Sequence, residues 1–316
     1  MNHKNSAQGT QGTQGTQGTQ GTQDTQAPEA PQSPQSPQSP QSPQSPQCPA
    51  TPLNAPRIEA QLTAESLGRP LYIEDHIDST NARLLKLGEN GAPHGTTLLA
   101  ETQASGRGRR GRPWHSPPGA NLYLSTLLRP PLEPRLASPI TLGVAVAVAR
   151  ALTQTAQVHP TLKWPNDLLL SGKKTAGILT EMRTHRHTLS FLVVGIGVNV
   201  NTRQFPPHLA NTATSLALQT GSPHSRETLA ASLLNHLDSI YQLFLSQGAQ
   251  PLLDEWKRLP NMLGEPVSIH PPGPKTKLHG VARGLDQDGA LLLETPDGHL
   301  QRILSGDLVQ SADLLN

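Results

Sequence analysis

Two short repeats at the start of the chain limit what it can fold into. Residues 8–22 are five copies of Gln-Gly-Thr, and residues 31–45 are five copies of Pro-Gln-Ser. Neither repeat contains a residue that could build an apolar core, so we expect residues 1–57 to form a disordered, low-complexity tail, extended in its proline-rich half. The folded part of the chain is therefore expected to begin near Ile58.

Charge and cysteine content narrow the class of protein. The few charges of the tail cancel, so the formal net charge of +2 belongs to residues 58–316, a small excess that does not suggest a dedicated nucleic-acid binder. The single cysteine, Cys48, lies in the tail, which excludes internal disulfides and a cysteine metal cluster. The first fifty residues contain no apolar run typical of a signal peptide, and no later stretch looks long enough to span a bilayer. We therefore expect a soluble, cytoplasmic protein without a membrane partner.

The stretch GRGRRGRPW at residues 106–114 is the strongest candidate for a functional site. Glycine permits positive φ and close approach to a ligand, and arginine presents a planar fork of donors that matches phosphate and carboxylate. Three interpretations compete: a solvated or nucleic-acid-binding basic loop, a dinucleotide-binding fingerprint, and an anion-clamping catalytic loop. The fingerprint needs a helix directly after the glycines. Pro113, Pro117 and Pro118 break the residues where that helix would start, so this interpretation fails.

Polar residues at a predicted helix start form a second group. The run DSTN at residues 78–81 precedes an apolar-periodic stretch that stops at Gly88. One of these side chains caps the helix, and the run contains more polar groups than a cap needs. The remaining hydroxyl and amide groups are candidates for ligand contacts, as is Gln103, which follows a predicted strand at residues 96–101.

Charged residues at predicted strand ends form a third group. The segment KWPNDLLL at residues 163–170, a Ser-Gly turn and a pair of lysines predict a hairpin. Lysines beside a tight turn are often only solvent-exposed. Lys163, Asp167 and Lys174 nevertheless lie at the ends or edges of strands, where sites are commonly built.

The apolar strand FLVVGIGVNV at residues 191–200 carries a row without side chains. Gly195, Gly197 and Asn199 share one side, because strand side chains alternate between faces. Glycine weakens a strand unless something must come close to its backbone. A flat ligand ring lying over both glycines and read by Asn199 is one explanation, and close approach of a neighbouring element of the protein is the other.

The remaining pattern predicts helices and strands followed by strands alone. Helices are expected at residues 140–156, 226–247 and 251–259, and a further strand at 121–128. Four short strands then follow Gly264, separated by Gly, Pro and Asp turns, which suggests a small appended β-barrel. These four strands are expected at residues 267–269, 280–283, 290–294 and 301–303.

Taken in chain order, these segments resemble the bacterial biotin–protein ligases. Any one block would be weak, but the ordered set is specific and runs from about residue 70 to the C-terminus. The matching blocks are DSTN at 78–81, GRGRRGRPW at 106–114, KWPNDLLL at 163–170, KTAGIL at 174–179, GIGVNVN at 195–201, ATSL at 213–216 and SGD at 305–307. The resemblance implies an α+β fold. A mixed-sheet catalytic domain like that of class II tRNA synthetases would span residues 58–262, and a small SH3-like β-barrel would span residues 263–316.

The resemblance also implies a two-step ligation. Biotin would be activated by ATP, with Mg²⁺ carried by the ATP phosphates, to give biotinyl-5′-AMP. The biotinyl group would then pass to a lysine of a biotin carboxyl carrier protein or domain, for example that of acetyl-CoA carboxylase. Family members with a winged-helix domain also act as repressors. Repeats take that place here, so we expect no repressor activity, no specific DNA binding, and a monomer or weak homodimer.

Site residues follow from the same resemblance. The expected catalytic residues are Arg109, Lys174 and Asp167, and no metal ligand is assigned. The expected biotin-binding residues are Ser79, Thr80, Asn81, Gln103, Gly106, Arg107, Gly108, Arg109, Lys174 and Gly195. The expected ATP- or adenylate-binding residues are Arg109, Arg110, Arg112, Trp114, Lys174 and Asn199.

Two other functions stay open from the sequence. A lipoate or octanoate ligase shares the catalytic fold but would need an elongated aliphatic tunnel. A nucleic-acid-binding protein acting through the arginine loop would show strong, salt-dependent affinity.

Overall fold

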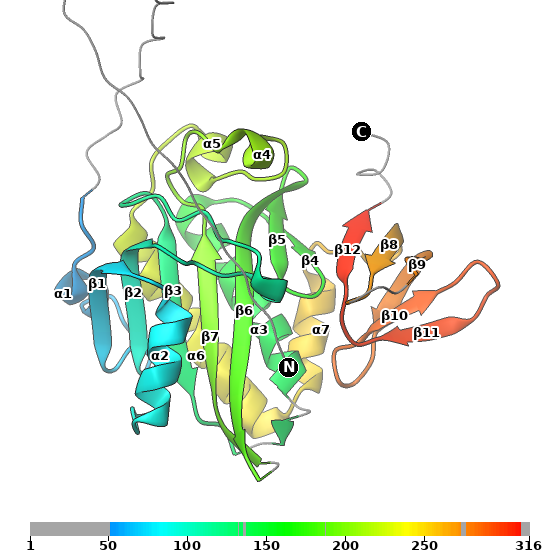
Figure 1. Ribbon diagram of the computed structural model, residues 1–316, viewed down its shortest axis with the longest axis horizontal. Coiled ribbons are helices and arrows are strands. Elements are labelled where there is room, and N and C mark those ends of the chain that lie inside the picture. The colour runs from blue at the N-terminus through cyan, green and yellow to red at the C-terminus, as the bar shows by residue number, and fades with distance from the viewer. Residues whose placement is uncertain (1–50, 132, 135–136, 187, 273–275, 311–316) are drawn as a thin grey trace, which may run out of the picture. The chain divides into compact units, whose positions relative to one another are not determined.

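The computed structural model describes residues 51–310 except 132, 135–136, 187 and 273–275 (Figure 1). The repeats of the predicted tail lie outside these residues. The predicted tail boundary at residue 57 needs correction, because it cuts through a helix, α1 (Ala55–Glu59), whose Ile58 is fully buried. Asn54 caps this helix by accepting a hydrogen bond from the amide of Arg57, and Pro56 follows at its first turn. This asparagine-proline pair is the sequence signal that the prediction overlooked.

A seven-stranded mixed sheet forms the centre of the larger domain, with the strand order β1-β2-β3-β7-β6-β5-β4 (Figure 1). Strands β1 and β2 pair in parallel, and all other neighbours in this sheet pair antiparallel. The strands are β1 (Leu71–Ile77), β2 (Thr97–Gln103), β3 (Leu122–Leu128), β4 (Thr161–Lys163), β5 (Asp167–Leu170), β6 (Lys173–His185) and β7 (Thr188–Val198). The mixed sheet of the expected α+β fold is thus confirmed.

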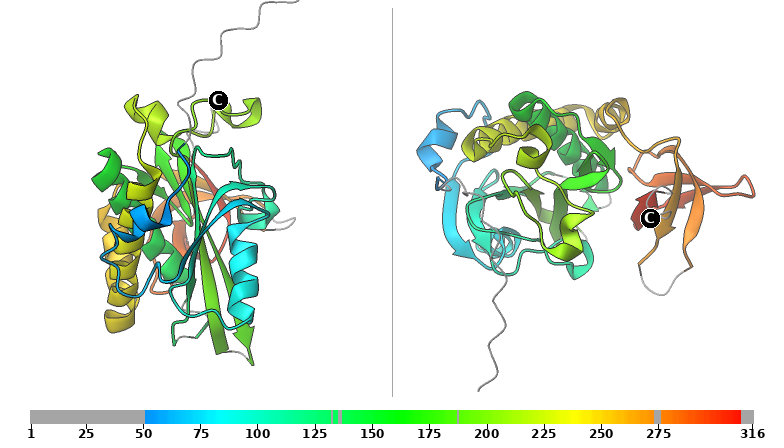
Figure 2. Two further views of the ribbon diagram at one scale, coloured as in Figure 1. Left: turned by 90° about the vertical axis from the view of Figure 1, so that its left-hand side faces the viewer. Right: turned by 90° about the horizontal axis from the view of Figure 1, so that it is seen from above.

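Helices cover both faces of this sheet (Figure 2). Helix α2 (Thr80–Glu89) packs on one face, against β2, β3 and β7. The opposite face is covered by α3 (Ala137–Ala156), α6 (Arg226–Gln247) and α7 (Gln250–Arg258). Two short helices, α4 (Pro207–Ala210) and α5 (Leu216–Thr220), lie in the connection between β7 and α6.

Helix α3 corrects one expectation from composition. Its segment Ser138–Ala156 is long and apolar enough to cross a membrane, although no such stretch was expected. Within the structure 72% of this segment is buried, since α3 packs between the sheet and the helices α6 and α7. Its apolar character therefore has a structural explanation, as the central helix of the core.

A five-stranded antiparallel sheet follows, with the order β11-β10-β9-β8-β12. It confirms the predicted C-terminal β domain, and the glycines of both predicted Asp-Gly turns, Gly289 and Gly298, have positive φ. The last strand was not predicted. The strands are β8 (Pro266–His270), β9 (Leu278–Leu285), β10 (Leu291–Glu294), β11 (Leu300–Ile303) and β12 (Asp307–Gln310).

A buried ion pair fixes the first described residues to the sheet. Arg226 on α6 is 4% exposed, and its Nη1 lies 2.7 Å from Oε2 of the buried Glu101 on β2. The same guanidinium donates to the carbonyl oxygen of Thr51 at 2.7 Å, and the amide of Leu53 donates to Glu101 Oε1. The chain before α1 is therefore bound to β2 at the strand that leads into the arginine loop.

Candidate active site

A cavity of about 930 Å³ lies under the arginine loop and is large enough for a small acid together with a nucleotide. Of the residues expected from the sequence, all but Gly106 and Arg110 line it. The C-terminal sheet contributes Asp307 and Val309, so both domains build the wall. Segments far apart in sequence thus meet at one site.

The N-terminus of α2 forms a polar cluster at one part of this cavity. Ser79 is the helix cap, and its Oγ accepts from the amide of Ala82. Thr80 donates from its amide (2.9 Å) and its hydroxyl (3.1 Å) to Oε1 of Gln103. The predicted division into one cap and additional polar groups therefore describes the local structure.

Ser125 on β3 completes the cluster and was missed by the sequence analysis. Its Oγ lies 2.6 Å from Asn81 Oδ1 and 2.7 Å from Thr80 Oγ1, and it is fully buried. The amide nitrogen of Asn81 donates to the carbonyl of Leu179 and to Glu181. The polar pair Ser125-Thr126 inside an otherwise apolar strand was the available signal, because buried hydroxyls need partners.

The glycine face of β7 is covered by the protein's own side chains. A Cβ at Gly195 would fall 2.1 Å from Asn81 Oδ1, and a Cβ at Gly197 would fall 2.5 Å from the Trp114 indole. A flat ring does lie over Gly197, but it is this tryptophan, so the expectation of a ligand ring over both glycines is wrong. The alternative of a close neighbouring element accounts for the pattern. The Asn199 amide nitrogen donates to the carbonyl oxygen of Thr214 at 3.0 Å.

Lys174 lies in the cavity with two fixed neighbours. Its Nζ is 2.6 Å from Asp167 Oδ1 and 5.3 Å from the centroid of the Trp114 ring. A Cβ at Gly177 would approach both the lysine and the tryptophan at 3.0 Å, so this glycine makes room for their contact. The carboxylate and the aromatic face hold the ammonium group in one place, where it can meet an anion.

The arginine loop itself is a closed turn. The amide of Gly108 donates to the carbonyl of Arg112 at 2.7 Å, and the amide of Trp114 donates to the carbonyl of Gly106 at 2.8 Å. Only a single 3₁₀ turn, η1 (Arg109–Gly111), lies between them. The rejection of the dinucleotide-binding interpretation is confirmed, since no α-helix follows the glycines.

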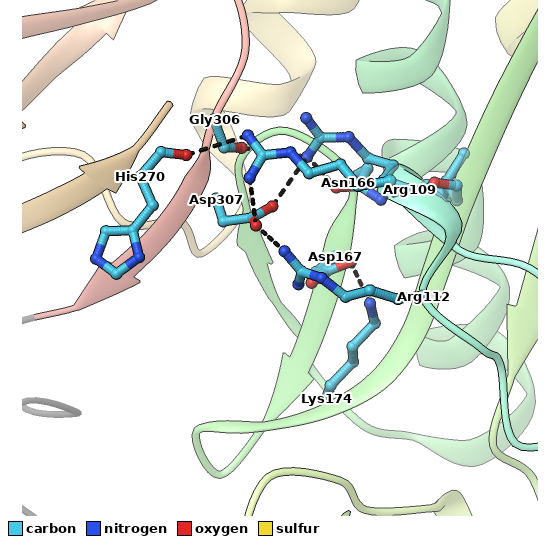
Figure 3. A network of polar contacts seen from close by, with 10 residues as sticks. Arg109, Arg112, Asn166, Asp167, Lys174, His270, Gly306 and Asp307 are labelled. Carbon is cyan, nitrogen blue, oxygen red and sulfur yellow. Dashed lines mark hydrogen bonds and ion pairs between the residues drawn. The ribbon is translucent and has the colours of Figure 1, made fainter. Parts of the chain in front are cut away.

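The arginines of this turn have different partners (Figure 3). Arg109 Nη1 donates to Asn166 Oδ1 at 3.1 Å and to the carbonyl of Gly306 at 3.2 Å. Asn166 is itself fixed, because its amide nitrogen donates to the carbonyl of Ile178 at 2.7 Å. Burial lowers the pKa of Arg109 from its usual value, and Arg110 adds to this effect. An arginine stays charged under such a shift, so Arg109 is a partly desolvated cation.

Arg110 does not line the cavity, which corrects its expected place beside the nucleotide. Its Nη1 lies 2.8 Å from Asp307 Oδ2, and its Nη2 donates to the carbonyl of His270 at 3.1 Å. Arg112 also forms an ion pair with Asp307, while lining the cavity. The C-terminal sheet thus binds the outer side of the loop.

The charges around the cavity favour an anionic ligand. Cationic side chains outnumber carboxylates in its wall. The two carboxylates are Asp167 and Asp307, and the six cationic residues are Arg107, Arg109, Arg112, Lys163, Lys173 and Lys174. Burial lowers the pKa of His115, and the nearby His208 adds to this, so the charged form of this imidazole is disfavoured. Among the residues that the structure describes, no group of three or more His, Cys, Asp or Glu side chains is placed to hold a metal ion.

Comparison with known proteins identifies the family. Residues 74–199 match the Biotin/lipoate A/B protein ligase family, and residues 262–309 match the Biotin protein ligase C terminal domain. The biotin–[acetyl-CoA-carboxylase] ligase of Mycobacterium tuberculosis is 33% identical over 265 residues, which cover 82% of this chain and 96% of that protein. The bifunctional ligase/repressor BirA of Escherichia coli is 37% identical over 257 residues, covering 81% and 77%.

A solved structure agrees with the sequence comparisons. The biotin protein ligase from Aquifex aeolicus in complex with biotin and ATP superposes with a TM-score of 0.66 at 31% identity, covering 76% of this chain and 99% of that one. The chain therefore belongs to the biotin–protein ligase family of enzymes. Both the catalytic fold and the C-terminal domain expected from the sequence are those of this family.

Proposed function

We propose that this ligase activates biotin with ATP as biotinyl-5′-AMP and transfers the biotinyl group to one lysine of a biotin carboxyl carrier domain, such as that of acetyl-CoA carboxylase. The observation that carries the proposal is the composition of the cavity wall. A neutral donor–acceptor cluster from α2 and β2 lies at one part, and a set of fixed cations lies at another. This matches a ligand with a polar neutral head and a carboxylate that must react with a triphosphate.

Activation joins two anions, so fixed positive charge is the main requirement. A biotin carboxylate oxygen attacks the α-phosphorus of ATP, the bond from that phosphorus to the β-phosphate bridging oxygen breaks, and pyrophosphate leaves. Lys174 and Arg109 are held by Asp167 and Asn166 respectively, at 2.6 and 3.1 Å. Donors that are held before the reaction stabilise charge without reorganising, which is usually the largest catalytic effect. We assign these two cations to the reacting phosphate and carboxylate, and Asp167 to the positioning of Lys174.

Binding of the biotin head is assigned to the polar cluster. The ureido group is neutral and offers both N–H donors and a carbonyl acceptor. Thr80, Gln103 and Ser79 supply hydroxyl and amide groups at the cavity wall. The backbone around Gly106, Arg107 and Gly108 would close over the bound head. Asn81 acts by positioning, because its side chain is already bonded to β6 and lies against Gly195.

The nucleotide is assigned to the part of the cavity near Asn199. Asn199, Trp114, Arg112 and Phe205 all line the cavity. Mg²⁺ would enter with ATP and neutralise charge on the phosphates. We assign it no protein ligand, and Asp167 pairs with Lys174.

Transfer completes the reaction. The acceptor lysine amine attacks the acyl carbon of biotinyl-5′-AMP, an amide bond forms, AMP leaves with the bridging oxygen, and the amine loses a proton. An acyl-adenylate hydrolyses when water reaches it, so a loop closed over the cavity protects the intermediate.

We propose a single-function, cytoplasmic enzyme that is a monomer or weak homodimer. Relatives named as ligase/repressors are 34–37% identical to this chain. Residues 8–22 and 31–45 are repeats without a core-forming residue, which supports the single-function proposal. A repressor would bind a DNA operator sequence tightly at physiological salt, and we expect only weak, salt-sensitive binding in a fluorescence anisotropy titration.

The experiment that tests the substrate assignment is ATP–pyrophosphate exchange with biotin, lipoate and octanoate in parallel. We expect exchange with biotin alone, followed by labelling of a purified carrier domain. Exchange stimulated only by lipoate or octanoate would show that biotin is the wrong substrate. The proposal that the enzyme activates an acid with ATP would still hold.

A further inference from the structure

One carboxylate in the C-terminal sheet faces three arginines of the loop. Asp307 lies 2.8 Å from Arg110 and 3.9 Å from Arg109, and it also pairs with Arg112 (Figure 3). Its side chain is 22% exposed, so these contacts are neither fully buried nor fully solvated. A single negative charge neutralises only part of three guanidinium charges, so the cluster keeps an attraction for a further anion.

Backbone contacts bring the loop to the same place on this sheet. Asp307 on β12 and His270 on β8 are direct cross-strand partners. Arg110 contacts both residues, through the carboxylate of one and the carbonyl of the other. Arg109 reaches the carbonyl of Gly306, the residue before Asp307. The loop is therefore bound at one spot by side-chain and main-chain acceptors together.

The conformation of Arg110 supports a purpose for these contacts. Its φ is +57°, a left-handed conformation that glycine adopts more readily than any residue with a Cβ. Such a residue persists where surrounding contacts over-determine it. The side-chain contacts of Arg110 are those to the C-terminal sheet. The residue with the strained backbone is therefore also a residue that binds the loop to this sheet.

We propose that Asp307 is a positioning residue that latches the arginine loop closed over the cavity. Without a bound nucleotide, Asp307 is the counter-ion of the loop arginines. A bound phosphate would contact the same arginines. The C-terminal domain then acts in the reaction by holding the lid, without contacting the reacting atoms. This inference rests on the proposed function for its consequence, retention of the acyl-adenylate, but the latch itself can be tested without substrate.

The test is limited trypsin digestion of the substrate-free full-length chain, scored by mass spectrometry for cleavage after Arg107, Arg109 and Arg110. Asp307→Asn keeps the side-chain shape and removes the charge. We expect its loop to be cut roughly fivefold to tenfold faster than the wild-type loop, as befits loss of a partly exposed ionic network. Asp307→Glu should restore most of the protection. Asp288→Asn is the matched control, since Asp288 is another carboxylate of this domain that pairs with Arg302, away from the loop.

Two further measurements separate a latch from a merely structural contact. Combining Arg110→Ala with Asp307→Asn should expose the loop no more than the stronger single variant, because both remove the same contact. In steady state, Asp307→Asn should raise KM for ATP several-fold while kcat for adenylate formation changes less than about twofold.

An unchanged rate of loop cleavage in Asp307→Asn, with the fold intact by circular dichroism, would overturn the latch. Additive effects in the double variant would also overturn it. Neither result would affect the proposed function, which is judged by biotin-dependent exchange in the wild-type enzyme.

Discussion

Two ion clusters in this chain have opposite construction. Glu101 and Arg226 form a buried pair, one carboxylate to one guanidinium, between a strand and a helix of the core. Asp307 faces three arginines at partial exposure, between a loop and the C-terminal sheet. The first is balanced and the second has excess positive charge. A balanced buried pair fixes its elements, whereas an unbalanced exposed cluster can exchange its partner for another anion.

The energetic reason is the cost of removing water from charge. A buried charge that loses its partner is left uncompensated, so breaking such a pair is expensive. A partly exposed pair is screened by solvent, and each contact contributes little to stability. Removing the carboxylate should therefore act on stability at Glu101 and on function at Asp307.

The largest effect is expected for Glu101→Ala. Arg226 would remain buried without its counter-charge, and the free energy of unfolding should fall by about 3–5 kcal/mol. Urea denaturation followed by circular dichroism measures this change. Replacing both residues, as Glu101→Leu with Arg226→Met, should recover much of the loss. A decrease below about 1 kcal/mol in the single variant would show that the pair does not fix the core.

The second-largest effect is expected for Lys174→Ala, and it should appear in activity. Removing one oriented donor from the cationic wall should cost about 2–4 kcal/mol of transition-state stabilisation, which is a loss of tens- to a thousandfold in biotin-dependent exchange. Lys257→Ala, on the surface of α7, is the control and should behave like the wild type. Near-normal exchange by the Lys174 variant would remove this residue from the reacting site.

Two truncations sharpen the role of the first described residues. Deleting residues 1–50 should leave stability and exchange unchanged, because the repeats contain no core-forming residue. Deleting residues 1–57 removes the Thr51 carbonyl and Leu53 amide that complete the Arg226 and Glu101 contacts, and also much of α1. The loss should be about 1–3 kcal/mol of unfolding free energy. Equal melting temperatures for both truncated chains would contradict this difference.

Among the substitutions that change stability, the smallest effect is expected for Asp307→Asn, at less than about 1 kcal/mol. Added salt should reduce even this effect, since screening weakens exposed pairs. Thermal unfolding at low and high ionic strength measures it. A loss as large as that at Glu101 would erase the distinction between the two clusters.

Local signals predicted the longer helices α2, α3, α6 and α7, whereas the short helices α1, α4 and α5 were missed. Helix α6 runs over the predicted residues 226–247. Its ends were predictable because the capping residues Ser225 and Gly248 directly flank the helix in the sequence. Strand β1 was missed, since its residues Glu74, Asp75 and His76 break the apolar alternation of a strand at a sheet edge. Capping depends on neighbouring residues, whereas edge strands depend on a partner far along the chain.

The site shows the same limit more clearly. Residue types at Lys174, Asp167 and Gln103 pointed to one cavity, because the ordered blocks already implied their meeting. What covers Gly197 could not be read from the strand, since Trp114 comes from a loop and its packing is long-range. The outward direction of Arg110 depends on its positive φ, which follows from contacts with the C-terminal sheet.

The central claim is that the cavity under the arginine loop makes and keeps an acyl-adenylate. The direct measurement is a single turnover with biotin and α-labelled ATP in the absence of acceptor, followed by rapid gel filtration. We predict close to one equivalent of biotinyl-5′-AMP retained per enzyme, which a carrier domain then consumes. Formation of labelled ADP would contradict the account. So would the absence of labelled adenylate from the enzyme fraction.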